Sequence, residues 1–86
     1  MYKVLYTSNS EKDAKKIARS HLKKKCLQLL EILVRNPYQT PLPYEKLCGD
    51  LSGFYSRRIN IQHRLIYEVD DKKKIVKILS MWTHYE

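Results

Sequence analysis

Hydrophobic residues recur at every second position near the start of the chain. Tyr2, Val4 and Tyr6 would share one face of an extended segment, and this period, with its aromatic and β-branched residues, is typical of a strand. The pattern therefore predicts a strand over residues 2–7. Three polar residues at positions 8–10 then interrupt it.

The next hydrophobic residues recur at helical spacing. Ser10 with Asp13 fits a helix-opening box, in which the serine hydroxyl accepts a hydrogen bond from an unpaired backbone N–H, so we expect a helix to begin there. Two apolar stripes follow, and their centres are rotated apart around the helix axis. The first stripe consists of Ala14, Ile17, Ala18 and Leu22, and the second of Cys26, Leu29, Leu30 and Leu33. This predicts two helices that break near residues 20–23 and end at Asn36, ahead of Pro37. One long bent helix is the alternative, because no Gly or Pro marks the break.

Turn residues divide the second half of the chain into short hydrophobic runs. Three prolines predict an extended loop over residues 38–44. The predicted strands after it span residues 54–61, 63–69 and 74–82. One strand, two helices and a three-stranded meander predict a single α+β domain over residues 1–86. Its sheet is expected to be of the antiparallel type and twisted, with both N-terminal helices packed on one face.

Composition narrows the class of partner. A chain of 86 residues has room for one domain, and its 17 Lys and Arg against 9 Asp and Glu give a formal charge of +8, a balance typical of proteins that bind a polyanion. Nucleic acid is the leading interpretation. A lipid surface is the competitor, but the chain shows neither a basic amphipathic anchor nor a lipidation signal. No stretch approaches the roughly 20 apolar residues of a membrane span, so we expect a cytoplasmic protein with no membrane partner.

The two cysteines do not indicate a metal site. Cys26 and Cys48 stand in no Cys/His spacing that matches zinc, so neither a metal nor another cofactor is expected. Cys26 reads as a small apolar residue of a helix.

The positive charge has two interpretations. Residues 1–36 hold most of the excess, and these helix lysines either follow a phosphate backbone or form an ordinary solvated face. Arg57, Arg58 and Arg64 fall within predicted strands, where a planar guanidinium suits bidentate phosphate recognition. Salt bridging is the alternative for these arginines. The acidic side chains available for it are Glu45, Asp50 and Glu68.

The C-terminal half contains the groups that metal-free RNA cleavage requires. That reaction needs a base for the 2′-hydroxyl, an acid for the leaving 5′-oxygen and cations around the transition state. Glu45 lies in the proline-bordered loop, Arg58 and Arg64 lie on neighbouring strands, and His84 follows the last strand. These groups would converge at one end of the sheet if the three strands are adjacent. The alternative is that Glu45 and His84 are solvated bystanders.

Three motifs identify a family. Residues 47–59 read Leu-Cys-Gly-Asp-Leu-Ser-Gly-Phe-Tyr-Ser-Arg-Arg-Ile, residues 63–67 read His-Arg-Leu-Ile-Tyr, and residues 84–85 read His-Tyr. In this order they strongly resemble the signature of the Txe/YoeB toxins in the RelE-like superfamily. The resemblance implies a RelE/YoeB-like RNase fold and the toxin of a type II toxin–antitoxin system. It also implies a ribosome-dependent mRNA endoribonuclease that cuts in the decoding site by 2′-hydroxyl attack and inhibits translation. The implied partners are a cognate antitoxin, the ribosome with its mRNA, and a second copy in a homodimer.

The resemblance also assigns roles to residues. Glu45 stands where the family has its general base, Arg64 where a phosphate-stabilising arginine sits, and His84 where the general acid sits. Arg58 and Tyr85 match residues that hold and orient the RNA.

The sequence departs from the family pattern at Cys48 and Glu86, and it offers two further candidate RNA contacts. Family members often have a lysine at the position of Cys48, so Lys46 is expected to supply that cation. Tyr55, like Tyr85, offers a ring on which a base can stack. Glu86 extends one residue past the usual end and places a carboxylate beside Tyr85.

Other functions fit parts of the sequence. A ParE-like toxin on the same scaffold would act on DNA gyrase, but those relatives lack the acid and base that Glu45 and His84 supply. A non-catalytic RNA-binding or ribosome-binding module needs only the charge of +8. A protein-interaction partner without any effect on RNA is a third alternative.

Overall fold

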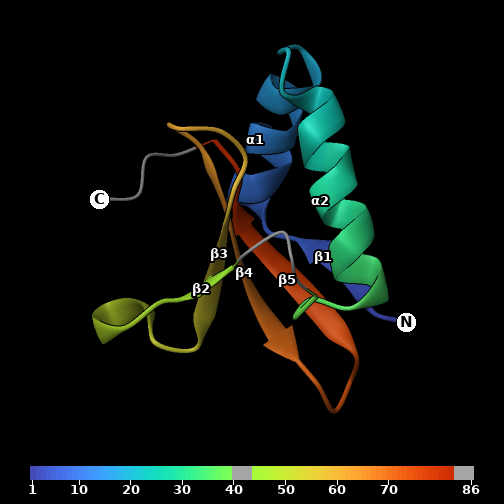
Figure 1. Ribbon diagram of the computed structural model, residues 1–86, viewed down its shortest axis with the longest axis vertical. Coiled ribbons are helices and arrows are strands. Elements are labelled where there is room, and N and C mark those ends of the chain that lie inside the picture. Colours follow the sequence, from blue (N-terminus) through green and yellow to red (C-terminus); the bar gives the residue numbers. More distant parts are fainter. Residues whose placement is uncertain (40–43, 83–86) are drawn as a thin grey trace.

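The computed structural model describes residues 1–39 and 44–82, which form two helices and one mixed sheet. The elements are β1 (Lys3–Tyr6), α1 (Ser8–Ala18), α2 (Lys23–Arg35), β2 (Glu45–Lys46), a 3-10 turn (Gly49–Leu51), β3 (Phe54–Arg58), β4 (Arg64–Asp70) and β5 (Ile75–Ser80). Both helices cover one face of the sheet (Figure 1). The predicted α+β class, the helix pair and its placement on one face are thus confirmed.

The five-stranded sheet has the order β1-β5-β4-β3-β2. The predicted meander forms its antiparallel part, β3-β4-β5. β1 joins that part in parallel to β5, with Val4 opposite Val76. The sheet is therefore mixed and not wholly antiparallel, because the two helices return the chain to the same end of the sheet before the meander begins.

The first helix begins earlier than expected. Thr7, not Ser10, is the N-cap, and its side-chain oxygen accepts a hydrogen bond of 3.1 Å from the Ser10 N–H. Ser10 is buried inside the first turn, where its hydroxyl donates to the Thr7 carbonyl. Asp13 is not part of a capping box either, because its carboxylate accepts a hydrogen bond of 3.0 Å from the Met81 N–H. The Asp13 contact and a hydrogen bond of 3.2 Å from Thr7 Oγ1 to the Leu79 carbonyl tie the start of α1 to the end of β5.

The break between the two helices has a polar cause. The Ser20 hydroxyl donates to the Ile17 carbonyl at 2.9 Å and accepts from the Leu22 N–H at 3.1 Å. A serine that bonds its neighbouring backbone in this way competes with helical hydrogen bonds. Ser20 therefore ends the first helix without a glycine or proline, and the prediction of two helices is confirmed.

The core lies between the helices and the sheet. Apolar side chains of both predicted helix stripes pack against the helix-side residues of the central strands. The buried cluster includes Ile17, Leu22, Cys26, Leu29, Leu33, Leu65, Tyr67, Val76 and Ile78. Cys26 is a core residue, as predicted, and burial raises the pKa of its thiol. In the described part of the chain, no helix is long and apolar enough to cross a bilayer.

Candidate active site

The sheet face opposite the helices brings together a carboxylate, a hydroxyl and two guanidinium groups. Strand register pairs Glu45 of β2 with Ser56 of β3, and Arg58 of β3 with Arg64 of β4. Paired residues share a face, and residues two apart on one strand do as well. These four side chains line a cavity of about 260 Å³.

Glu45 lies in a strand and not in the predicted loop. β2 is a two-residue edge strand paired with β3, and a hydrogen bond of 2.9 Å from the Leu47 N–H to the Phe54 carbonyl continues the pairing. This pairing holds the backbone of Glu45 at a defined position beside Ser56. The convergence of Glu45, Arg58 and Arg64 that the sequence only suggested is therefore present.

Glu45 and Arg64 form a loose ion pair. The Glu45 Oε1 atom lies 3.8 Å from Arg64 Nη1, and the Glu45 side chain is 67% exposed while that of Arg64 is 19% exposed. A charge-assisted hydrogen bond is much shorter, about 2.7–2.9 Å. An ion pair this long and this exposed restrains the carboxylate weakly, so Glu45 is free to change partners when a ligand arrives.

Arg58 and Arg64 place two cations side by side. They are directly opposite each other on neighbouring antiparallel strands, where like charges repel. Arg64 has Glu45 as an acidic partner at ion-pair distance. Among the residues that the structure describes, Arg58 has no acidic partner at that distance. The pair therefore forms a site that an anion would stabilise.

Arg57, which the sequence grouped with the phosphate-binding candidates, does not face this cavity. Its side chain is 0% exposed on the helix side of the sheet. The Nη2 atom donates to the carbonyls of Pro37 and Gln39 at 2.9 and 3.0 Å, and Nε donates to the Tyr67 hydroxyl at 3.1 Å. Its Cζ also lies 5.2 Å from the centre of the Tyr44 ring. Arg57 therefore anchors both flanks of the segment that leads into β2 and so helps to place Glu45.

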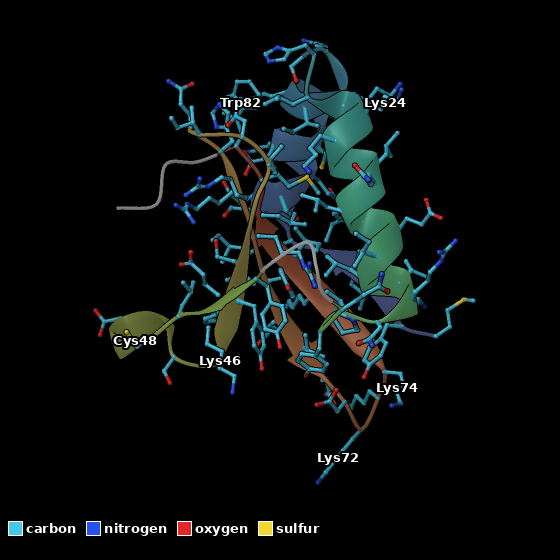
Figure 2. All side chains as sticks on the ribbon, in the orientation of Figure 1. Lys24, Lys46, Cys48, Lys72, Lys74 and Trp82 are labelled. Carbon is cyan, nitrogen blue, oxygen red and sulfur yellow. The ribbon has the colours of Figure 1, made fainter. Side chains whose placement is uncertain are left out.

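The structure does not bring Lys46 and Tyr55 into the cavity. They are paired with each other on β2 and β3, one residue along from Glu45 and Ser56, and so lie on the other face. Tyr55 packs against Tyr67, with ring centres 5.7 Å apart. Lys46 is exposed at the same edge of the molecule as Cys48 (Figure 2).

His84, Tyr85 and Glu86 lie outside the described residues. The ring of Trp82 stacks on that of His63, with centres 4.0 Å apart and planes tilted by 21°. His63 directly precedes Arg64 in the chain. Trp82 is therefore anchored next to the strand that carries Arg64, two residues before His84.

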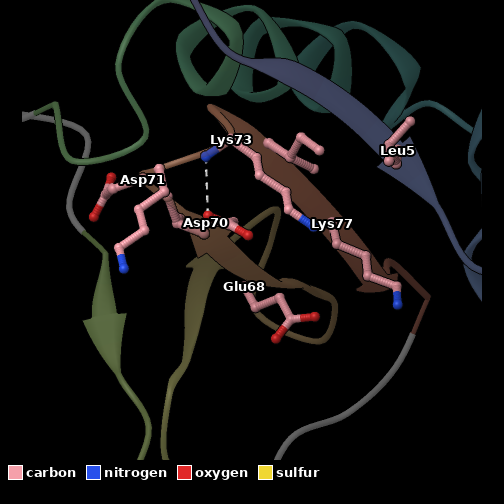
Figure 3. Close-up of a pocket in the computed structure, with 9 residues that line it drawn as sticks. Leu5, Glu68, Asp70, Asp71, Lys73 and Lys77 are labelled. Carbon is pink, nitrogen blue, oxygen red and sulfur yellow. Dashed lines mark hydrogen bonds between the residues drawn. The ribbon is translucent and has the colours of Figure 1, made fainter.

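A second hollow, of about 590 Å³, lies along β4 and β5 near their connecting turn (Figure 3). Its charged residues are Glu68, Asp70, Asp71, Lys72, Lys73 and Lys77. The Asp70 carboxylate is already occupied, since it accepts a hydrogen bond of 3.0 Å from the Lys73 N–H. Of the residues expected to bind RNA or to act in catalysis, those that the structure describes do not line this hollow, and its mixed charges favour no anion. The smaller cavity is therefore the better candidate site.

Ser56 is the residue of this cavity that the sequence reasoning missed. It lies inside the Ser-Arg-Arg motif, and the alternation of side chains along β3 would have placed it on the face of Arg58. A small hydroxyl gives no sequence signal of its own, because serine is common on every protein surface.

Comparison with known proteins identifies the family of this chain. The family model described as "YoeB-like toxin of bacterial type II toxin-antitoxin system" matches residues 6–85. Toxin YoeB of Streptomyces coelicolor is 34% identical over 76 residues, which are 86% of this chain and 90% of that protein. Toxin YoeB of Synechocystis is 38% identical over 58 residues, which are 67% of this chain. The match spans 65% of that protein, just under two thirds of its length.

Solved structures resemble the chain over nearly its whole length. The YoeB–YefM toxin–antitoxin heterotetramer of Staphylococcus aureus contains a chain with 35% identity and a TM-score of 0.82, covering 99% of both chains. The YoeB dimer of the same organism matches with 36% identity and a TM-score of 0.82, covering 98% of both chains. With a family model that spans almost the whole sequence, this chain belongs to the YoeB family of toxins of bacterial type II toxin–antitoxin systems.

Proposed function

We propose that this toxin is a ribosome-dependent mRNA endoribonuclease that cuts in the decoding site and thereby inhibits translation. The observation that supports the proposal most directly is the single cavity shared by Glu45, Arg58 and Arg64. A carboxylate beside two permanent cations is suited to a reaction in which a proton is removed next to a phosphate.

The proposed reaction uses the RNA's own 2′-hydroxyl as the nucleophile. Glu45 takes the proton of that hydroxyl, and the 2′-oxygen forms a bond to the adjacent phosphorus. The bond from phosphorus to the 5′-oxygen breaks, and His84 gives a proton to the leaving oxygen. The products are a 2′,3′-cyclic phosphate and a 5′-hydroxyl. Arg64 stabilises the charge that develops on the phosphoryl oxygens.

The remaining roles concern RNA binding. Arg58 binds the phosphate together with Arg64, because the two residues are cross-strand partners and line the same cavity as Glu45. Tyr85 stacks on or orients a base beside His84. Lys46 and Tyr55 lie on the reverse face, so any contact they make with RNA involves the edge of the sheet at β2 and not the cavity.

The proposed partners follow from the function and from the relatives. A YoeB of Staphylococcus aureus is found in complex with YefM and also as a dimer. We expect this chain to be silenced by a cognate antitoxin with an acidic segment that covers Arg58 and Arg64, and to form a homodimer. The message-bearing ribosome places the site of action in the cytoplasm.

The charge of +8 favours a second candidate, a ribosome-binding module without catalysis. One experiment separates the two. The purified toxin is added to ribosomes programmed with a defined message, and with the same message carrying 2′-deoxyribose at the cut site. We expect the first message to be cut to a 2′,3′-cyclic phosphate and the second to be bound but intact. Binding of both messages without cleavage would support the non-catalytic module, and a 3′-hydroxyl product would show that the 2′-oxygen is not the nucleophile.

A further inference from the structure

The cavity contains a hydroxyl group that the proposed chemistry leaves unused. Ser56 lies on β3 between the edge strand and β4, and it is 1% exposed. Its Oγ atom is buried and has no hydrogen-bond partner within the described part of the chain. A buried hydroxyl without a hydrogen-bond partner is unfavourable, so a conformation that supplies an acceptor is favoured.

Glu45 is the neighbour that can supply that acceptor. Of the four described residues that line the cavity, Arg58 and Arg64 carry only side-chain donors, whereas the carboxylate of Glu45 carries only acceptors. Glu45 is also the direct cross-strand neighbour of Ser56 on the same face. In such pairs the Cβ atoms lie about 4.5–5.5 Å apart, so rotation about the side-chain bonds of Glu45 brings its carboxylate within reach of Ser56 Oγ.

The present position of the carboxylate explains why this bond is unmade. Glu45 is turned toward Arg64, but at 3.8 Å and largely exposed. A bound phosphate competes for the same guanidinium, and it offers bidentate oxygen pairs that Arg64 binds more strongly than a distant carboxylate. Once Arg64 turns to the phosphate, the Glu45 carboxylate is released from this ion pair, and Ser56 lies next to it with an unused donor.

We propose that Ser56 is a positioning residue, which donates a hydrogen bond to the Glu45 carboxylate when RNA phosphate occupies Arg64. This inference rests on the proposed function, since it assigns a second state to the proposed base. In that state one carboxylate oxygen is held by Ser56, and the other is directed toward the 2′-hydroxyl. A base held in this way needs no further ordering at the moment of reaction.

The kinetic test uses single-turnover cleavage of a ribosome-bound message. For Ser56→Ala we expect the maximal cleavage rate to fall about tenfold, with half-saturation changed less than about twofold. Ser56→Thr, which keeps the hydroxyl, should recover the rate to within about threefold of the parent. The matched control Ser52→Ala removes an exposed serine in the turn before β3 and should leave the rate unchanged.

Thermal unfolding separates positioning from stability. Because Ser56→Ala removes a buried hydroxyl with no partner, its Tm should be equal to or above that of the parent. An Ala variant that cuts as fast as the parent overturns the proposal. So does one whose rate loss accompanies an equal loss of binding and a lower Tm, because that result indicates a structural role alone.

A structural test is independent of activity. In the double variant Arg58→Ala/Arg64→Ala, no guanidinium remains in the cavity, as if both were taken by phosphate. A crystal structure of this variant should show Ser56 Oγ about 2.5–3.0 Å from a Glu45 carboxylate oxygen. A carboxylate that points into solvent there overturns the inference. If the parent toxin cuts no message at all, the proposed function fails, while this structure still decides whether Ser56 binds Glu45.

Discussion

Arg58 and Arg64 lie directly opposite each other on β3 and β4, on the sheet face that the helices leave uncovered. Like charges directly opposite each other on neighbouring strands repel each other in the free protein. A phosphate between them would remove the repulsion and satisfy both, so the charges of this cavity favour an anion. This relationship, and not the overall charge of +8, is what distinguishes the site from an ordinary basic surface.

Loss of either proposed proton-transfer group should relieve toxicity. We expect Glu45→Gln and His84→Gln each to lower the rate of message cleavage by at least about 100-fold, the usual range for a general base or acid. Growth after induction without antitoxin, followed together with toxin abundance, measures the effect. Variants that arrest growth as strongly as the parent at equal abundance would show that the base and acid are assigned wrongly.

The salt dependence of ribosome binding should distinguish the arginine pair from the helix lysines. Each phosphate contact contributes to the slope of log affinity against log salt, so Arg58→Ala should reduce that slope by about 1. Lys24 is exposed on α2, across the sheet from the cavity (Figure 2), and is the matched control. A reduced slope for Lys24→Ala would instead support the interpretation that the helices follow the phosphate backbone.

Replacing Arg57 should lower the free energy of unfolding more than replacing Arg58 does. Arg57→Lys keeps the charge but loses the fork that reaches Pro37, Gln39 and Tyr67. We expect the free energy of unfolding to fall by about 2–4 kcal/mol, because buried partners of a charged group are left unpaired. Arg58→Lys, at an exposed position, should change it by less than about 0.5 kcal/mol. Urea unfolding in a Glu45→Gln background, which avoids toxicity, makes the comparison, and equal effects of the two substitutions would contradict the anchoring role.

The two cysteines should differ in reactivity. Burial raises the pKa of the Cys26 thiol, so at any pH below that value a smaller fraction is thiolate than in a free cysteine. Cys48 is exposed. At pH 8 iodoacetamide should therefore alkylate Cys48 at least about tenfold faster than Cys26, as mass spectrometry of the peptides would show. Cys48→Ser leaves Cys26 as the single thiol, and its alkylation should become rapid only after unfolding in guanidinium. Rapid alkylation of the folded Cys48→Ser variant would contradict a buried Cys26.

Periodicity in the sequence was enough to determine most of the elements. The alternation of Tyr2, Val4 and Tyr6 predicts β1, and the two rotated apolar stripes predict two helices in place of one. These patterns are local, since each depends on which side of one element must avoid water. Helix boundaries were less certain, because Thr7 and Ser10 are both capable caps and the choice depends on contacts with β5.

The motifs in the sequence also determined the family and the candidate residues, but only the tertiary structure decided how those residues meet. The parallel pairing of β1 with β5 joins Val4 to Val76, and no local pattern encodes the direction of a contact so distant in sequence. The alternation of β3 separates Arg57 from Arg58, but packing of the helices decided which of the two is buried. Glu45 reaches the arginines because pairing with β3 converts the end of a proline-rich segment into an edge strand. The sequence determines which chemical groups are present. The distances between those groups depend on the strand register, which is fixed because the whole helix-side face of the sheet must be buried at once.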